Sequence, residues 1–241
     1  MSTTTPAILD ITASTWLEYD KAQYKSLRAY LTHLSGLLDP YKLNCPPERI
    51  NAILLTPHAG VRFSGFAGLS TYLPLASNIA HIPGTIIIFS TWHAGPTTTN
   101  RAILPAFDKI KTPLGMLEVN TELRSLLLAR APHTFSIDTP DNNYMKVEHS
   151  HIVQYPLIQQ VFSKTPIMPR VLPILIPATN KSKFTPDIYD LLNRQTYFIA
   201  CNTDISHVNG ELRRKAGIRD VLCYKKPGAK LYYMEGFGFG F

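Results

Sequence analysis

The chain has 241 residues, of which 45% are hydrophobic, so it is long enough to bury a sizeable core and too apolar for a disordered protein. Its three cysteines, Cys45, Cys201 and Cys223, are odd in number and show no paired spacing, which argues against a disulfide scaffold and favours a reducing, cytoplasmic compartment, with an organelle as the alternative. No run reaches the ~18 apolar residues of a membrane span, and the net charge of +7 is spread over the chain, which indicates a solvated basic surface, with nucleic-acid binding as the alternative.

The first half of the chain alternates helical and strand patterns. Apolar residues at helical spacing predict an amphipathic helix from Leu17 to Leu38, which Asp39-Pro40 ends. A buried strand is predicted from Ala52 to Thr56, a helix of small residues from about Gly65 to Ala76, and a second buried strand from Thr85 to Ser90.

The second half continues this alternation after a loop predicted from Pro96 to Lys111. The remaining predicted elements are helices at Thr121–Arg130, Glu148–Phe162 and Pro186–Arg194, strands at Val171–Ile176 and Tyr197–Asn202, and a C-terminal β-hairpin around Pro227-Gly228. Strands that alternate with helices indicate an α/β fold with a mostly parallel central sheet flanked by helices. Because no linker or internal repeat interrupts the pattern, we expect a single domain over residues 1–241.

Histidines follow three of the predicted strands. His58 lies in Pro57-His58-Ala59-Gly60 after the first strand, His93 follows the second, and His207 follows Asp204 after the last. Because parallel strands end at the same edge of a sheet, these imidazoles are expected to converge on one crevice, together with His149 of Glu148-His149-Ser150. Histidine is the commonest metal ligand and titrates near neutrality, so such a cluster indicates metal binding or acid–base chemistry.

Each of these residues also has a purely structural interpretation. His58 and His93 could be turn residues beside a helix start, and Asp204 could accept backbone N–H groups in a capped turn. A carboxylate such as Glu148 is favoured at a helix start by the helix dipole, whatever its function. The remaining candidates are expected to be surface or packing residues: His81, His151 and Cys201.

Several motifs, in this order along the chain, resemble those of the Memo family, whose fold is similar to that of the class III extradiol dioxygenases. The matching segments are Ala13-Ser14-Thr15-Trp16, Pro57-His58-Ala59-Gly60, Trp92-His93, Thr112-Pro113-Leu114-Gly115, Glu148-His149-Ser150, Arg170–Ile176 and Asp204-Ile205-Ser206-His207. The resemblance covers about residues 12–210, and residues 211–241 form a divergent tail. It implies the same α/β fold.

The resemblance also implies a metal site, from which this chain departs. Members of the family bind metal through two histidines, matched here by His58 and His93, and through a cysteine in a Cys-Gly segment further along. Cys223 is the sole cysteine after His207 and lies in a dissimilar context. Since two imidazoles alone hold a divalent ion weakly, the sequence predicts either no metal or weakly bound copper or iron, with Cys223 as the candidate third ligand.

Two functions follow from these departures. The first is a Memo-like protein with reduced or no catalytic activity, kept as a binding or architectural subunit of a larger protein assembly. The alternative is an active metal-dependent redox enzyme, in which His58 and His93 bind copper or iron while His149, Asp204 and His207 act as acid–base or supporting residues. The shortened C-terminus favours the first function, because a more open cleft excludes water less well.

The last residues of the chain form a separate motif, Gly236-Phe237-Gly238-Phe239-Gly240-Phe241. In an extended conformation, alternation at period 2 places the rings of Phe237, Phe239 and Phe241 on one face. Burying one such ring contributes about 1.5–3 kcal/mol. This segment is therefore predicted to pack into a groove on a protein partner.

Overall fold

A computed structural model describes residues 7–38, 53–77, 84–93, 99–177 and 197–202 of the chain. Its centre is a six-stranded sheet, and the strands lie in the order β2 (Ile53–Thr56), β9 (Tyr197–Asn202), β3 (Thr85–Thr91), β8 (Arg170–Ile176), β4 (Ala102–Leu104) and β7 (Phe135–Ile137). All neighbours in this sheet are parallel except β8 and β4. The predicted α/β fold with a mostly parallel central sheet is confirmed.

The core of this sheet is β3, which lies between β9 and β8 and is buried along its whole length. A run of β-branched and aromatic residues is typical of a strand covered on both faces. β9 lies between β2 and β3 and is parallel to both, so the carboxyl ends of the three strands lie at the same edge of the sheet. That edge is where the chain places His58 and His93.

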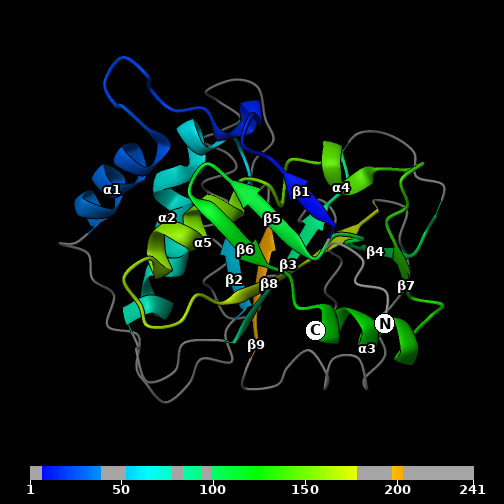
Figure 1. Ribbon diagram of the computed structural model, residues 1–241. Helices are drawn as coiled ribbons and strands as arrows, with labels where there is room; N and C mark the ends of the chain where they lie inside the picture. Colours follow the sequence, from blue (N-terminus) through cyan, green and yellow to red (C-terminus); the bar gives the residue numbers. More distant parts are fainter. Residues whose placement is uncertain (1–6, 39–52, 78–83, 94–98, 178–196, 203–241) are drawn as a thin grey trace, which may run out of the picture.

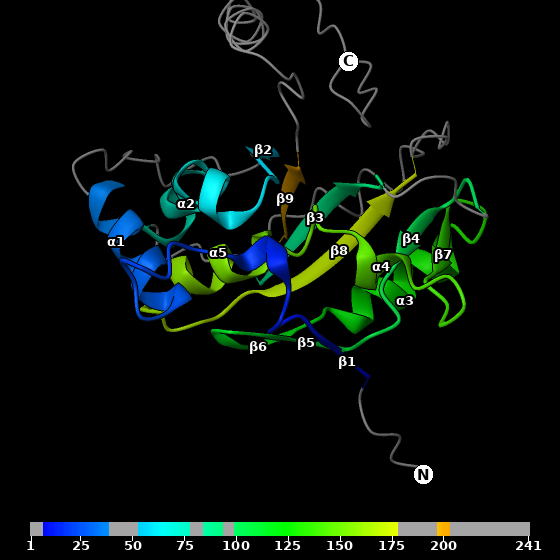
Figure 2. The same ribbon diagram turned by 90° about the horizontal axis from the view of Figure 1, so that it is seen from above.

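A second, three-stranded sheet was not predicted from the sequence. It contains β1 (Ile8–Asp10), β5 (Lys109–Thr112) and β6 (Gly115–Glu118), with β5 in the middle. Figure 2 shows it on one side of the central sheet, and a single bridge between Val119 and Val171 joins the two. Each of its strands has only three or four residues, which is too short for an alternating pattern to stand out in the sequence.

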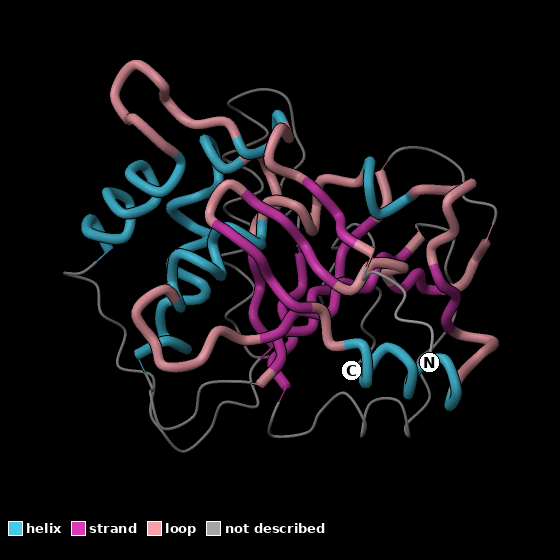
Figure 3. Tube along the Cα trace, viewed as in Figure 1, coloured by secondary structure: helices cyan, strands magenta, loops and turns pink. Residues whose placement is uncertain are grey.

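Three helices pack beside one another next to the β2 end of the central sheet: α1 (Leu27–Leu38), α2 (Val61–Ser77) and α5 (Gln154–Phe162) (Figure 1). A Cβ atom on Gly68 of α2 would lie 2.5 Å from the Leu157 side chain of α5, so the glycine allows these two helices to approach closely. The other helices are η1 (Thr15–Leu17), α3 (Thr121–Arg130) and α4 (Tyr144–Val147). Figure 3 shows the strands in the middle of the molecule with helices around them.

Three predicted boundaries are wrong. The first helix begins at Leu27 rather than Leu17, because the Ser26 hydroxyl accepts the Ala29 N–H at 3.1 Å and caps it there. The stretch from 96 to 111 contains β4 and the start of β5. Glu148 does not start a helix: it directly follows α4, and α5 begins only at Gln154.

The predicted helix at 186–194, the C-terminal hairpin and the tail with Phe237, Phe239 and Phe241 lie outside the described residues. None of the helices in the described ranges combines the length and hydropathy that crossing a bilayer requires.

Candidate metal centre

His58 lies in the turn that joins β2 to α2. The residue is only 5% exposed, and its turn is held by the Ser64 hydroxyl of α2, which donates to the Ala59 carbonyl. The turn begins with Pro57 and ends with Gly60, so β2 stops at Thr56 and α2 starts directly after Gly60. The imidazole is therefore fixed at the carboxyl edge of the central sheet.

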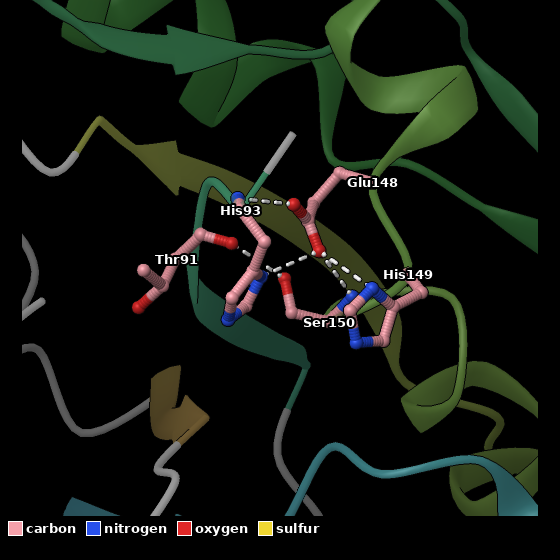
Figure 4. Close-up of polar contacts among 5 residues, drawn as sticks. All are labelled: Thr91, His93, Glu148, His149 and Ser150. Atoms are coloured by element: carbon pink, nitrogen blue, oxygen red, sulfur yellow. Dashed lines mark hydrogen bonds and ion pairs between the residues drawn. The ribbon is translucent and has the colours of Figure 1, made fainter. Parts of the chain in front are cut away.

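His93 lies just beyond the end of β3 and is tied to Glu148. Its backbone N–H donates to Glu148 Oε2 at 2.8 Å, and its Nδ1 lies 3.0 Å from Glu148 Oε1. Figure 4 shows both contacts, with the carboxylate on one side of the imidazole. One side chain thus fixes both the backbone and the ring of His93.

Glu148 also contacts the ring of His149 and the backbone of Ser150. His149 Nδ1 lies 3.2 Å from Glu148 Oε1, and the Ser150 N–H donates to the same oxygen at 2.8 Å. The Ser150 hydroxyl in turn donates to the Thr91 carbonyl at 3.0 Å, which joins this segment to the end of β3 (Figure 4). Glu148 is therefore the centre of a cluster that joins two histidines from distant parts of the chain.

The Glu148 carboxylate is 1% exposed. Burial acts to raise its pKa, but hydrogen bonds from the His93 ring and from the Ser150 and His93 backbone outweigh it and lower the pKa to about 2. Glu148 is ionised at neutral pH and can only accept hydrogen bonds. Its Oε1 atom therefore faces Nδ1 of His93 and of His149 as an acceptor, which is the arrangement of the carboxylate–histidine pairs of metal sites.

The three imidazoles of His58, His93 and His149 face one another. One ring nitrogen from each lies within 4.8 Å of the others. The ring centroids are 4.9 Å apart for His58 and His93, 5.0 Å for His93 and His149, and 5.7 Å for His58 and His149. Neutral imidazole nitrogens are suitable donors for copper, iron or zinc, so this donor set fits a transition-metal ion.

Trp16 of η1 covers one of these rings. Its indole stacks on His149 with centroids 3.8 Å apart and an angle of 16° between the planes. The Trp16 carbonyl also lies against Gly60, where an added Cβ atom would approach it to 3.4 Å. The N-terminal segment thereby packs against both the His149 ring and the turn that carries His58.

His151, two residues after His149, has a different environment. It is fully buried, and its Nδ1 lies 2.7 Å from the hydroxyl of Tyr155, which is also fully buried. Burial lowers the pKa of His151 to about 4 and raises that of Tyr155. This buried position agrees with the prediction that His151 is a packing residue rather than a ligand.

The structure brings together His58, His93 and His149 of the predicted site residues. The sequence predicts a catalytic role for His149, and the structure shows that this residue could hold a metal ion together with His58 and His93. β9 ends at Asn202, paired between the strands that precede His58 and His93. Asp204 and His207 follow β9 and, like Cys223, lie outside the described residues, so their roles remain predictions.

Sequence reasoning missed the roles of Glu148 and Trp16. Glu148 was interpreted as a helix-dipole residue, although its position directly before a candidate histidine is a usable signal for a carboxylate that orients imidazoles. Trp16 was noted only for its resemblance to a family motif. Its contact with His149 joins residues far apart in the chain, which no local pattern reveals.

Comparisons with known proteins show the family of the chain. The family described as "Memo-like protein" matches residues 17–224. A MEMO1 family protein of Sulfolobus acidocaldarius is 30% identical over 167 residues, which are 68% of this chain and 56% of the relative. One from Sulfurisphaera tokodaii is 36% identical over 145 residues, or 58% of this chain and 48% of the relative. The chain spans about half the length of these curated relatives, and it belongs to the Memo family.

Proposed function

We propose that this protein binds a transition-metal ion, copper or iron, through the imidazoles of His58, His93 and His149. The observation that carries the proposal is the convergence of one ring nitrogen from each residue within 4.8 Å. Catalytic metal sites commonly use three protein ligands and keep a further position for water or substrate. A bound copper or iron ion would supply Lewis-acid and one-electron chemistry there.

The surrounding residues support such a site. Glu148 Oε1 lies against Nδ1 of both His93 and His149, which would orient Nε2 of each ring toward a metal ion. His58 is almost fully buried, whereas the side chains of His93 and His149 are 27% and 17% exposed. His58 is thus the most deeply buried of the three ligands, and the other two rings are partly accessible to solvent.

We favour the active redox enzyme over a protein without catalytic activity. The case for absent or weakly bound metal rested on a missing third ligand, and His149 offers a ring nitrogen for that role. The other ground for reduced activity, the shortened C-terminus, lies outside the described residues. The role as a subunit of a larger assembly rests on Phe237, Phe239 and Phe241, outside the described residues, and remains a separate prediction.

The test is metal binding by the purified full chain. After removal of metal with a chelator, the protein is titrated with Cu(II) and with Fe(II), the latter without oxygen, and bound metal is measured by elemental analysis. The two tryptophans also report binding: Trp16 stacks on His149, and Trp92 directly precedes His93. We expect one equivalent of metal and quenching of tryptophan fluorescence by Cu(II).

The matched controls are His58→Ala, which removes a ligand, and His133→Ala, which removes an exposed histidine outside the cluster. His58→Ala should abolish stoichiometric binding, and His133→Ala should leave it unchanged. Wild-type protein that holds no more metal than His58→Ala would contradict the proposal.

A further inference from the structure

Gln154 is the first residue of α5, and its side chain is fully buried. Its Nε2 donates to the Pro57 carbonyl at 2.9 Å, and its Oε1 accepts from the hydroxyls of Thr56 and Tyr72, each at 2.9 Å. Thr56 and Tyr72 are fully buried as well. One amide thus connects α5 to the end of β2 and to the middle of α2.

The orientation of this amide is fixed by its partners. The Pro57 carbonyl can only accept a hydrogen bond, so the NH2 group must face it. The carbonyl oxygen of Gln154 then faces the two hydroxyl groups, which can both donate to it. In a buried environment each of these groups is costly to leave without a partner, so the arrangement has little freedom to change.

The Pro57 carbonyl belongs to the peptide bond that leads directly into His58. A shift at this carbonyl therefore moves His58. The other two imidazoles, of His93 and His149, come from a different unit and are held by Glu148. The distance between His58 and this pair consequently depends on how α5 is joined to the turn after β2.

We propose that Gln154 is a positioning residue, which sets His58 at the distance from His93 and His149 that a shared metal ion requires. This inference rests on the proposed function, because it assumes that the three imidazoles bind one ion. Residues that orient metal ligands typically change metal affinity about 10- to 100-fold when they are replaced.

Gln159 provides a matched control on the same helix. It is 5% exposed, its Oε1 accepts from the Thr112 hydroxyl, and its Nε2 donates to the Met116 carbonyl. Its partners lie in or beside the small sheet rather than at the histidines. Gln154→Met and Gln159→Met therefore remove the same group from equally buried sites, and only the first removes a contact to the His58 turn.

The experiment is a Co(II) titration of the metal-free full chain, followed by the visible absorption bands of the bound ion, with thermal unfolding measured in parallel. We expect Gln154→Met to bind Co(II) about 10- to 100-fold more weakly than wild type, with shifted bands. Gln159→Met should lose thermal stability but keep the wild-type affinity and spectrum. A difference in the spectrum between the two variants reports coordination geometry, which a general loss of stability does not change.

Two outcomes would contradict these proposals, and a second variant covers the case in which Gln154→Met does not fold. If wild-type protein binds no Co(II), the proposed function itself fails. If wild type binds and Gln154→Met matches it in affinity and bands, the positioning role is wrong. If Gln154→Met does not fold, Tyr72→Phe removes one hydroxyl that holds the amide: weaker binding with shifted bands would support the role, and wild-type behaviour would overturn it.

Discussion

The candidate metal centre consists of two parts that are held by different chemistry. His93 and His149 share the ionised carboxylate of Glu148, which also accepts two backbone N–H groups. His58 sits in a turn whose neighbouring carbonyls accept from the neutral side chains of Gln154 and Ser64. Hydrogen bonds to a charged group are roughly twice as strong as those between neutral groups.

This difference indicates that His93 and His149 are held more firmly than His58. His93 and His149 form one unit, because loss of the Glu148 carboxylate would release both imidazoles together. His58 belongs to another unit. Its position relative to His93 and His149 depends on the packing of α2 against α5. Metal affinity should therefore depend most on Glu148, less on the packing around each ring, and least on single hydrogen bonds at the periphery.

The largest effect is expected from Glu148→Gln. The amide replaces one acceptor oxygen with a donor, which then faces N–H groups that also donate. We expect metal affinity to fall about 10- to 100-fold and the free energy of unfolding of the metal-free protein to fall by about 1–3 kcal/mol, measured by metal titration and urea unfolding.

Glu118→Gln is the control for this change, because Glu118 is 55% exposed and pairs with Lys109 away from the histidines. It should leave metal affinity unchanged. Wild-type affinity in Glu148→Gln would show that the carboxylate does not hold the two ligands.

A smaller effect is expected from Trp16→Ala. The substitution removes the indole that stacks on His149, and aromatic pairs contribute about 0.5–1.5 kcal/mol beyond the area they bury. That range corresponds to a roughly 2- to 10-fold loss of metal affinity. Trp92→Phe serves as the comparison, since Trp92 packs edge-on against Tyr144 with centroids 4.9 Å apart. Equal losses in both variants would indicate general destabilisation rather than support of His149.

The smallest effect is expected from Ser150→Ala. This change removes the hydroxyl bond to the Thr91 carbonyl but keeps the backbone N–H that binds Glu148. We expect a loss of about 0.5–1.5 kcal/mol in the free energy of unfolding and metal affinity close to that of wild type. A loss of affinity as large as that of Glu148→Gln would mean that the Thr91 contact, not the carboxylate, fixes the pair.

The sequence was sufficient for the long strands of the central sheet and for the convergence of His58, His93 and His149, but not for β4 and β7. Long buried strands such as Thr85–Thr91 have a clear apolar pattern, and a histidine after a parallel strand must lie at a known edge. Short elements such as Ile8–Asp10 leave no such pattern, because three residues cannot show a period. Their pairing is decided by tertiary contacts instead.

The convergence of His149 with His58 and His93 was expected from the family resemblance, but the contacts that hold His149 in place were not. His149 follows no strand, and the segment before α5 was expected to be helical. Its place beside His58 and His93 depends on Glu148, on the Ser150–Thr91 bond and on the stack with Trp16. The contacts of Ser150 with Thr91 and of Trp16 with His149 join residues far apart in the chain, and a single sequence does not reveal such pairings.

The central claim is that His149 is the third donor of the centre. X-ray absorption spectroscopy of the cobalt-loaded full chain tests it most directly, because the extended fine structure counts imidazole ligands and distinguishes nitrogen from sulfur. We expect three imidazoles and no sulfur in wild type, falling to two imidazoles in His149→Ala. Two imidazoles in both proteins, or a sulfur ligand in wild type, would contradict it.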